Sequence, residues 1–241
     1  MRPAGALEGL EVIVLCGGQG TRLGRLTAQT PKPLLPVGGF PFLLHRLQVL
    51  KGAGSGRVIL AVHYLADQFR AFADRYASSV PALTIVEEPT PLGTGGALRH
   101  ALAAVQTIRF AAFNGDSWLE QPLRPVLTQH LQRGASFTMV VVPAAQLVGG
   151  ARRKGVVTIG PNQEILGCST PEVIVDGWVN AGCYVLETAL VQRWPSGRYD
   201  LEQELMSLVP LGEGQVFYSS SSLVDIGTPE CYARAQQVVH A

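Results

Sequence analysis

The sequence carries little net charge and few lysines. Its formal net charge is +1, and the three lysines among its 241 residues are Lys32, Lys51 and Lys154. A balance this close to zero gives no broad electrostatic attraction to nucleic acid or to an anionic membrane surface. No apolar run approaches the roughly 20 residues that a membrane-spanning helix needs. The composition therefore predicts neither a nucleic-acid partner nor a membrane partner.

Cysteine is also scarce, and its spacing argues against two kinds of site. The four cysteines are scattered, and no two of them form a Cys-x-x-Cys pair. This spacing is unlike that of a zinc site or of a disulfide framework. Free, buried thiols are typical of cytoplasmic proteins. Since residues 1–9 also lack the apolar core of a signal peptide, we expect a cytoplasmic protein.

Long polar linkers and internal repeats are missing as well. The hydrophobic content is 47%, which suits one large domain with a well-buried core. No stretch is long and polar enough to separate two independent domains. We therefore expect a single domain over residues 1–241.

Short apolar runs alternate with helical patterns in the first part of the chain. Strands are predicted at 12–16, 57–62, 83–87 and 110–113, and helices at 41–53, 65–76 and 95–104. This alternation predicts an α/β, Rossmann-like fold, in which an open, mostly parallel sheet has helices on both faces. After about Pro143 we expect two strands, at 155–159 and 178–186, that are linked by irregular segments. Two helices are expected at 201–209 and 229–239.

The most informative stretch is the glycine-rich turn after the first predicted strand. Residues 15–23 read Leu-Cys-Gly-Gly-Gln-Gly-Thr-Arg-Leu, and residues 31–34 read Pro-Lys-Pro-Leu. Glycines at the end of a strand let backbone N–H groups approach a phosphate closely. Arg22 and Lys32 can neutralise the rest of a polyphosphate. The stretch therefore predicts a nucleoside triphosphate site at the carboxyl end of the strand.

Two other phosphate-binding motifs do not fit this turn. A Walker A loop needs a lysine directly after its glycines, and none is present here. The dinucleotide fingerprint needs a third glycine, which residues 21–23 do not supply in register. A bare Gly-Gly-x-Gly also suits an ordinary β–α turn. The prediction thus depends on the two cations, since a plain turn needs neither.

Two aspartates are candidates for a metal site. Asp116 follows the apolar run 110–113, at the end of a predicted strand, where ligands gather in open α/β sheets. Asp225 lies in the apolar segment 223–226, where an unpaired charge would be costly. Asp116 could instead cap a turn, and Asp225 could cap the following helix or form a structural ion pair, although Thr228 can supply that cap. Carboxylates of this kind suit Mg²⁺.

Together these segments resemble the signature of the sugar-1-phosphate nucleotidyltransferases. Family motifs are matched in order by Glu-Glu-Pro-Thr-Pro-Leu-Gly-Thr-Gly-Gly-Ala at 87–97, Asn-Gly-Asp at 114–116 and Asp-Ile-Gly-Thr-Pro at 225–229. The resemblance covers nearly the whole chain. Within the family, the chain is most similar to the D-glycero-D-manno-heptose 1-phosphate guanylyltransferases. The mannose-1-phosphate guanylyltransferases and the N-acetylmuramate-1-phosphate uridylyltransferases are near neighbours.

The resemblance implies that a nucleoside triphosphate and a sugar 1-phosphate react to give a nucleotide sugar and pyrophosphate. It favours GTP, because residues 88–97 resemble the guanylyltransferases, and a heptose 1-phosphate, because residues 199–202 resemble the heptose branch. UTP, CTP and other acceptors stay open, as does a homo-oligomer. A non-catalytic relative that senses sugar nucleotides also stays open, although Arg22, Lys32 and both aspartates are retained.

The resemblance further implies a role for each motif. It divides the domain into a nucleotide-binding half at about 10–143 and a sugar-binding half at about 144–241. Catalytic roles fall to Arg22, Lys32 and Asp116, and Mg²⁺ would be held by Asp116 and Asp225. The implied nucleotide-binding residues are Leu15, Gly17, Gly18, Gly20, Thr21, Glu88, Gly93, Thr94 and Asn114.

The implied sugar site is the turn Val-Asn-Ala-Gly at 179–182, where Asn180 and Gly182 would meet sugar hydroxyls. Asn180 could equally be a satisfied amide at the end of a strand. Many relatives carry a Phe-x-Glu-Lys segment before this turn, but residues 165–172 here contain no lysine. Arg152 and Lys154 could restore a cation for the sugar phosphate. A solvated basic loop explains these two residues equally well.

Overall fold

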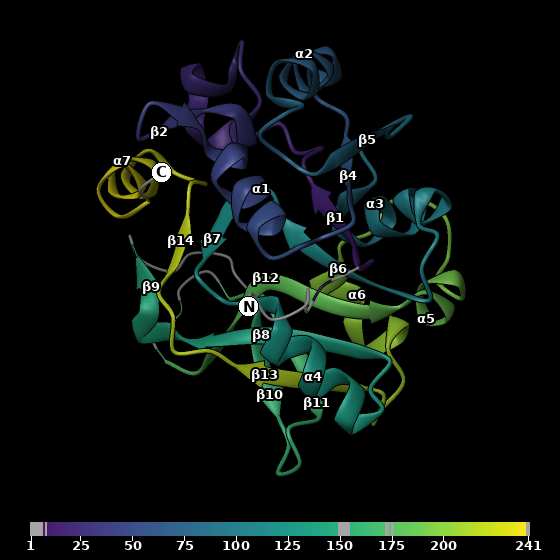
Figure 1. Ribbon diagram of the computed structural model, residues 1–241. Helices are drawn as coiled ribbons and strands as arrows, with labels where there is room; N and C mark the ends of the chain where they lie inside the picture. The colour runs from purple at the N-terminus through teal and green to yellow at the C-terminus, as the bar shows by residue number, and fades with distance from the viewer. Residues whose placement is uncertain (1–6, 8, 149–154, 172–173, 175, 240–241) are drawn as a thin grey trace, which may run out of the picture.

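The computed structural model describes residues 7, 9–148, 155–171, 174 and 176–239, and its centre is a nine-stranded sheet (Figure 1). Four neighbouring strands are parallel, in the order β5-β4-β1-β6. They are β1 (Glu11–Leu15), β4 (Arg57–Val62), β5 (Ala82–Glu87) and β6 (Arg109–Asn114). The α/β, Rossmann-like arrangement expected from the alternating pattern is confirmed.

The second part of the chain joins this sheet through a long antiparallel strand, β12 (Trp178–Glu187). One edge of β12 pairs with β10 (Val156–Ile159) near its start and with β6 near its end. The other edge pairs with β8 (Phe137–Pro143). Two further strands complete the sheet, β11 (Ile165–Ser169) beside β10 and β13 (Gly214–Tyr218) beside β8. Both halves of the chain thus share one sheet.

Helices cover both faces of the sheet, because successive strand residues point to opposite sides. In β1, Val12 and Val14 belong to one apolar cluster and Ile13 belongs to another. The first cluster includes residues of α1 (Phe42–Gly52), α2 (Ala66–Tyr76) and α4 (Leu123–Arg133). The second includes residues of α3 (Gly93–Ala101), α5 (Thr188–Gln192) and α6 (Leu201–Leu208).

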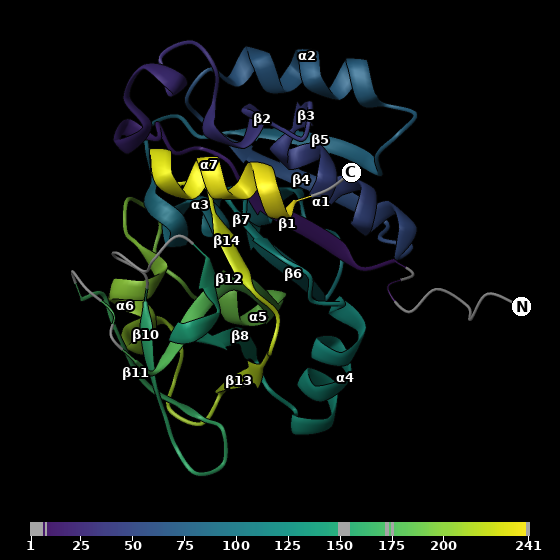
Figure 2. The same ribbon diagram turned by 90° about the vertical axis from the view of Figure 1, so that its left-hand side faces the viewer.

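A smaller three-stranded sheet lies beside the end of β6. It consists of β7 (Ser117–Leu119), β14 (Leu223–Asp225) and β9 (Leu147–Val148), with α7 (Pro229–Val238) packed against it (Figure 2). The Thr228 hydroxyl accepts a hydrogen bond from the Cys231 amide at 3.2 Å and caps α7. The expectation that Thr228 caps this helix is therefore confirmed.

The remaining elements are short. They are β2 (Pro36–Val37), β3 (Phe40–Pro41) and four 3₁₀ helices, Thr21–Thr27, Lys32–Leu34, Leu102–Ala104 and Ala144–Gln146. The segment 165–169, expected to be irregular, is strand β11, because it extends the antiparallel pairing of β10. The sequence patterns also did not predict α4, α5 or the strands β7, β8, β13 and β14.

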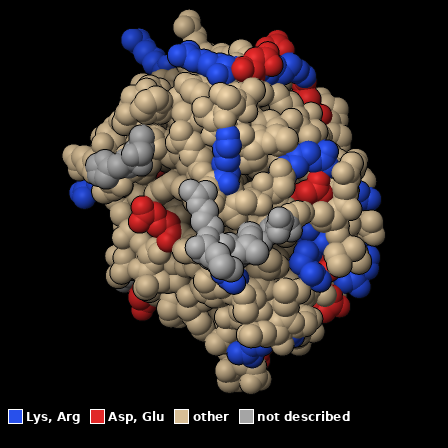
Figure 3. All heavy atoms as spheres, in the orientation of Figure 1, with Lys and Arg blue, Asp and Glu red and all other residues tan. Residues whose placement is uncertain are grey.

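The charged side chains on the surface and the burial of the cysteines can be compared with the low net charge and the scattered cysteines of the sequence. On the face shown in Figure 3, acidic and basic side chains are interspersed, without a broad patch of one sign. Cys16, Cys168 and Cys183 are free thiols; Cys168 is half-buried, and Cys16, Cys183 and Cys231 are buried. None of the described helices combines the length and the apolar character that a membrane crossing requires.

Candidate active site

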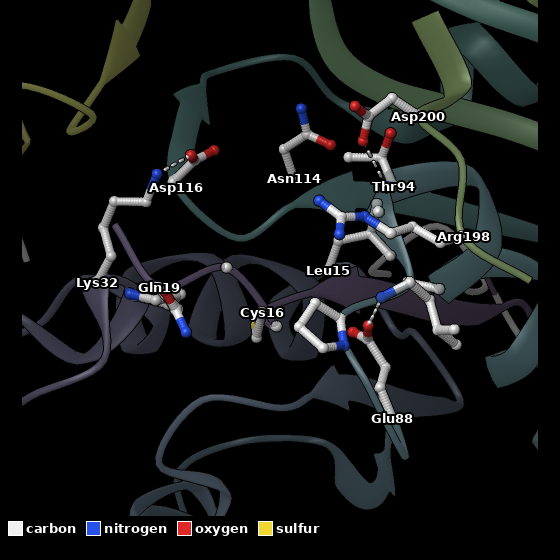
Figure 4. A pocket seen from close by; sticks show the side chains of 17 residues that line it. Leu15, Cys16, Gln19, Lys32, Glu88, Thr94, Asn114, Asp116, Arg198 and Asp200 are labelled. Carbon is white, nitrogen blue, oxygen red and sulfur yellow. Dashed lines mark hydrogen bonds and ion pairs between the residues drawn. The ribbon is translucent and has the colours of Figure 1, made fainter. Parts of the chain in front are cut away.

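A cavity of about 510 Å³ opens at the carboxyl ends of β1 and β6 (Figure 4). It brings together most of the residues that the motifs single out. The predicted residues in its lining are Leu15, Gly17, Gly18, Lys32, Glu88, Gly93, Thr94, Asn114 and Asp116. The position is the one expected for a ligand site in an open α/β sheet.

Other predicted residues do not line this cavity. Gly20, Thr21, Arg22, Asn180, Gly182 and Asp225 are outside its lining. Gly20 has a φ of 67° and starts the 3₁₀ helix Thr21–Thr27, so it serves the turn itself. Arg152 and Lys154 lie outside the described residues.

The glycine-rich turn fits closely around Glu88. A Cβ atom on Gly17 would lie 2.2 Å from Glu88 Oε1, so a larger residue would require this carboxyl group to shift. Glu88 is 4% exposed, and its Oε2 accepts a hydrogen bond from the Leu92 amide at 2.9 Å. Burial raises the pKa of Glu88. A buried carboxyl group therefore forms one wall of the cavity.

The segment Asn114–Asp116 forms the opposite wall. The Gly115 amide donates to the Leu15 carbonyl at 2.9 Å, and a Cβ atom on Gly115 would lie 2.6 Å from that oxygen. This close approach ties the end of β6 to the end of β1. Asp116 forms an ion pair with Lys32, whose side chain is 11% exposed. Figure 4 shows this pair on one side of the cavity.

Asp225 is brought near Asp116 by backbone pairing. β14 and β7 are antiparallel, with Asp225 opposite Ser117. The Ile226 amide donates to the Asp116 carbonyl at 3.0 Å. Residues next to one another across two paired strands lie close together. The backbones of the two predicted metal ligands are thus close, with Asp116 directly before β7 and Asp225 at the end of β14.

Arg22 lies on the Asp225 side of the site. A Cβ atom on Gly227 would lie 3.1 Å from Arg22 Nη2, so the guanidinium rests against the Asp225–Gly227 turn. Asp225 Oδ1 accepts a hydrogen bond from the Gly227 amide at 2.5 Å. The arginine is therefore near the aspartates without lining the cavity.

The predicted sugar-binding turn lies directly behind Asn114. Gly182 has a φ of 67°, and a Cβ atom there would lie 2.6 Å from Asn114 Nδ2. Asn180 is buried; its Nδ2 donates to Tyr184 at 2.7 Å and to Glu202 at 3.1 Å, and its Oδ1 accepts from the Gly182 amide at 2.8 Å. The Asn180 side chain is thus held by internal hydrogen bonds.

Two charged residues in the cavity were not predicted as site residues. Arg198 and Asp200 come from the segment between α5 and α6, and both belong to the lining. Asp200 Oδ1 accepts a weak hydrogen bond from the Thr94 amide at 3.4 Å. Figure 4 shows the Arg198 guanidinium pointing into the space between Leu15 and Thr94. The resemblance of residues 199–202 to a family segment was the one signal in this region, and it did not extend to Arg198.

The glycines of the 93–97 segment face two different surroundings, the cavity and the neighbouring segment 197–199. Gly93 and Thr94 line the cavity. Gly95 and Gly96 instead face the segment 197–199, where a Cβ atom would lie 2.3 Å from the Tyr199 ring and 2.1 Å from the Gly197 carbonyl oxygen, respectively. Their small size therefore lets the Arg198 segment pack against α3.

We predict that Gly17→Ala destabilises the protein and weakens nucleotide binding. The added methyl group must displace the buried Glu88 carboxyl group, and overpacking of this kind costs about 1–3 kcal/mol. Urea denaturation and nucleotide titration would measure both effects. Gly52→Ala is the matched control, because no atom lies within 4 Å of a Cβ at that position. Equal stability and binding for the two variants would contradict the close fit around Glu88.

Comparison with known proteins identifies relatives of this chain. A mannose-1-phosphate guanylyltransferase of Mycobacterium tuberculosis is 34% identical over 95% of this chain, and the chain spans 64% of that protein. A mannose-1-phosphate guanylyltransferase catalytic subunit beta of Drosophila melanogaster is 33% identical over 77% of the chain, which covers 50% of the relative. The chain thus spans about half to two thirds of these relatives.

A solved structure of similar length extends the comparison. HddC from Yersinia pseudotuberculosis has 26% sequence identity and a TM-score of 0.82, with 95% of this chain and 98% of HddC covered. The same protein has also been solved in complex with GMP-PN, with a TM-score of 0.81. The family model described as nucleotidyl transferase matches residues 11–241. The chain therefore belongs to the nucleotidyl transferase family.

Proposed function

We propose that this protein transfers a nucleotidyl group from GTP to a sugar 1-phosphate and releases pyrophosphate. The observation that carries the proposal is the cavity, which combines the glycine-rich turn, Lys32, Asp116 and Asn114 at the ends of β1 and β6. The guanylyltransferase names of the relatives and the GMP-PN complex of HddC support GTP. For the acceptor we propose D-glycero-D-manno-heptose 1-phosphate.

The chemistry needs cations and positioning more than a base. A phosphate oxygen of the sugar 1-phosphate attacks the α-phosphorus of the nucleotide, and the bond from that phosphorus to the β-phosphate oxygen breaks. The attacking oxygen is already an anion, so no strong general base is required. Catalysis then depends on holding two polyanions in line and stabilising the charge of the transition state.

The nucleotide would lie between the glycine-rich turn and residues 88–94. The Glu88 carboxyl group would accept hydrogen bonds from N–H groups of the base. Backbone amides of Gly17 and Gly18 and the Lys32 ammonium would contact the phosphates. We propose that Arg22 binds the β- and γ-phosphates. Its guanidinium would move away from residues 225–227 and toward the leaving pyrophosphate.

We also propose Mg²⁺ as the cofactor, held by Asp116 and Asp225. The pairing of β7 with β14 brings the backbone of Asp225 close to that of Asp116, which supports a shared role for their carboxylates. Mg²⁺ is usually bound through one or two carboxylates plus water and substrate phosphates. No group of three or more candidate ligand side chains occurs among the described residues, so phosphate oxygens would complete the coordination. Mg²⁺ would supply positive charge to the triphosphate when bound.

The sugar end of the site is assigned to residues near Asn114. We propose that Asn180 and Gly182 shape the sugar pocket and that Arg152 and Lys154 assist the sugar phosphate. Arg198 is a further candidate, because its guanidinium points into the cavity (Figure 4) and residues 165–172 lack the lysine of many relatives.

A nucleotide-by-sugar panel tests the proposal. GTP, UTP, CTP, ATP and dTTP would each be combined with the 1-phosphates of heptose, mannose, glucose and N-acetylmuramate in the presence of Mg²⁺. Pyrophosphate release and mass spectrometry of the nucleotide sugar are the readouts. We expect the highest kcat/KM for GTP with the heptose 1-phosphate. A preference for UTP would identify a uridylyltransferase, and binding without any product would support the sensing alternative.

Arg198→Met is expected to raise the acceptor KM about 10- to 100-fold, because one hydrogen bond to a charged group contributes about 1.5–3 kcal/mol. Loss of binding shared by ground state and transition state leaves kcat nearly unchanged. Arg193→Met is the matched control, since Arg193 is 59% exposed and pairs with Glu213. An unchanged acceptor KM in Arg198→Met would remove this residue from the sugar phosphate.

A further inference from the structure

Arg46 is a buried arginine on α1 that makes no ion pair with any described residue. It is 7% exposed. Its Nη1 donates to the Leu119 carbonyl at 3.1 Å, and its Nη2 makes a longer contact of 3.4 Å with the Ser117 carbonyl. Burying a cation without a carboxylate partner is costly, and burial lowers the pKa of Arg46 to about 10. The cost of burying this charge suggests that Arg46 has a specific role.

Two aromatic rings provide the other contacts of the guanidinium. Its central carbon lies 4.5 Å from the centre of the Phe113 ring and 4.8 Å from the centre of the Trp118 ring. Stacking on aromatic faces attracts the cation electrostatically. All these carbonyl and ring contacts are therefore made with residues 113–119.

Residues 113–119 are the part of the chain that presents the candidate metal ligand. Phe113 comes one residue before Asn114, and Ser117 comes directly after Asp116. Ser117 and Trp118 also pair with Asp225 and Val224 of β14. One buried guanidinium thus holds both sides of the turn that carries Asp116 and the strand against which Asp225 is placed.

We propose that Arg46 is a positioning residue that fixes Asp116 and Asp225 for a divalent cation; this rests on the proposed function of the site. Only a planar guanidinium can stack between two rings and donate to two carbonyls at once. Lysine keeps the charge but not the fork or the flat faces. Methionine fills similar space but leaves the β7 carbonyls without this donor.

Mn²⁺ binding is the main test, because it does not depend on turnover. Free Mn²⁺ would be followed by electron paramagnetic resonance in titrations of protein with equimolar GTP. We expect Arg46→Lys and Arg46→Met to weaken Mn²⁺ binding about 10- to 100-fold, as is typical when a group that orients a metal ligand is lost. The affinity for GTP in EDTA should change less than about twofold, because the substitutions leave the glycine-rich turn and residues 88–94 intact.

Arg57→Lys is the matched control that separates weaker Mn²⁺ binding from a general loss of stability. Arg57 is also partly buried, pairs with Glu11 and donates to the Ala104 carbonyl, but it lies at the opposite end of β1 from the cavity. Urea denaturation would place the variants on one stability scale. If Arg46→Lys and Arg57→Lys lower stability equally and leave Mn²⁺ affinity equal, Arg46 is merely structural and the proposal fails.

Hydrogen exchange gives a second readout if Arg46→Met does not fold. In Arg46→Lys we expect faster amide exchange at residues 114–119 than in the wild type, with unchanged exchange in β4 and β5. Unchanged exchange at 114–119 would also overturn the proposal. A wild type that binds Mn²⁺ but releases no pyrophosphate would refute the proposed function, while the Mn²⁺ comparison of the variants would still decide the role of Arg46.

Discussion

Asp116→Asn and Asp225→Asn are each expected to lower turnover about 100- to 1000-fold or more, the range seen when one preorganised electrostatic group is removed. A neutral amide is a poor ligand for Mg²⁺, so the charge that would stabilise the triphosphate is lost. Asp116→Asn also leaves the nearly buried Lys32 ammonium without its carboxylate. Steady-state kinetics at saturating substrates and thermal melting would measure activity and folding separately.

The same substitution elsewhere provides the control for the aspartates. Asp67 is 97% exposed on α2 and pairs with Arg70. Asp67→Asn should therefore keep wild-type turnover, because it removes a carboxylate far from the cavity. Near-normal turnover by Asp116→Asn or by Asp225→Asn, in a folded protein, would exclude that residue from the metal site.

Lys32→Met is expected to have the second largest effect, a loss of about 2–4 kcal/mol of transition-state stabilisation, and Arg22→Ala a similar one. Lys32 is fixed between two prolines at the wall of the cavity, so its charge is placed before the nucleotide arrives. Lys51→Met is the matched control, since Lys51 lies on α1 and donates to the Ser78 carbonyl at the surface. Wild-type kinetics in both Lys32→Met and Arg22→Ala would show that the phosphate-site assignment is wrong.

The sequence predicted the parts of the site that short segments determine. The end of β1 and the end of β6 were located because glycines and charged residues follow apolar runs there. The parallel arrangement of their strands then brings Leu15 and Asn114 to one edge of the sheet. Local patterns were sufficient for these residues because each turn is recognisable within a few residues, and ligands in open α/β sheets bind at the carboxyl ends of the strands.

Arg198 could not be found in this way, because its place depends on contacts distant in sequence. The Gly95 amide donates to the Tyr199 carbonyl at 3.1 Å, and the Tyr199 amide donates to the Leu92 carbonyl at 2.9 Å. These bonds fold the segment before α6 over the start of α3. Gly95 and Gly96 leave room for this packing, because a Cβ atom at either position would collide with the segment 197–199.

The small sheet explains the other difference between sequence and structure. Strands β7 and β14 contain three residues each, too few for a recognisable alternation of apolar and polar positions. Their pairing is nevertheless what brings Asp225 beside Asp116. The family motif predicted both aspartates. It did not predict the two strands or the buried Arg46 that support them.

The position of β12 has a consequence for how the protein can move. A strand that is hydrogen-bonded to β6, β8 and β10 leaves no hinge between the two halves of the chain. Rigid-body closure, as in proteins whose domains are joined by a flexible connection, would break these backbone bonds. Adjustment to substrates would then fall to the connections around the cavity, while the sheet beneath them stays fixed. We accordingly expect both halves to unfold in a single cooperative transition, and a bound nucleotide to stabilise the part of the chain after residue 143 as much as the part before it.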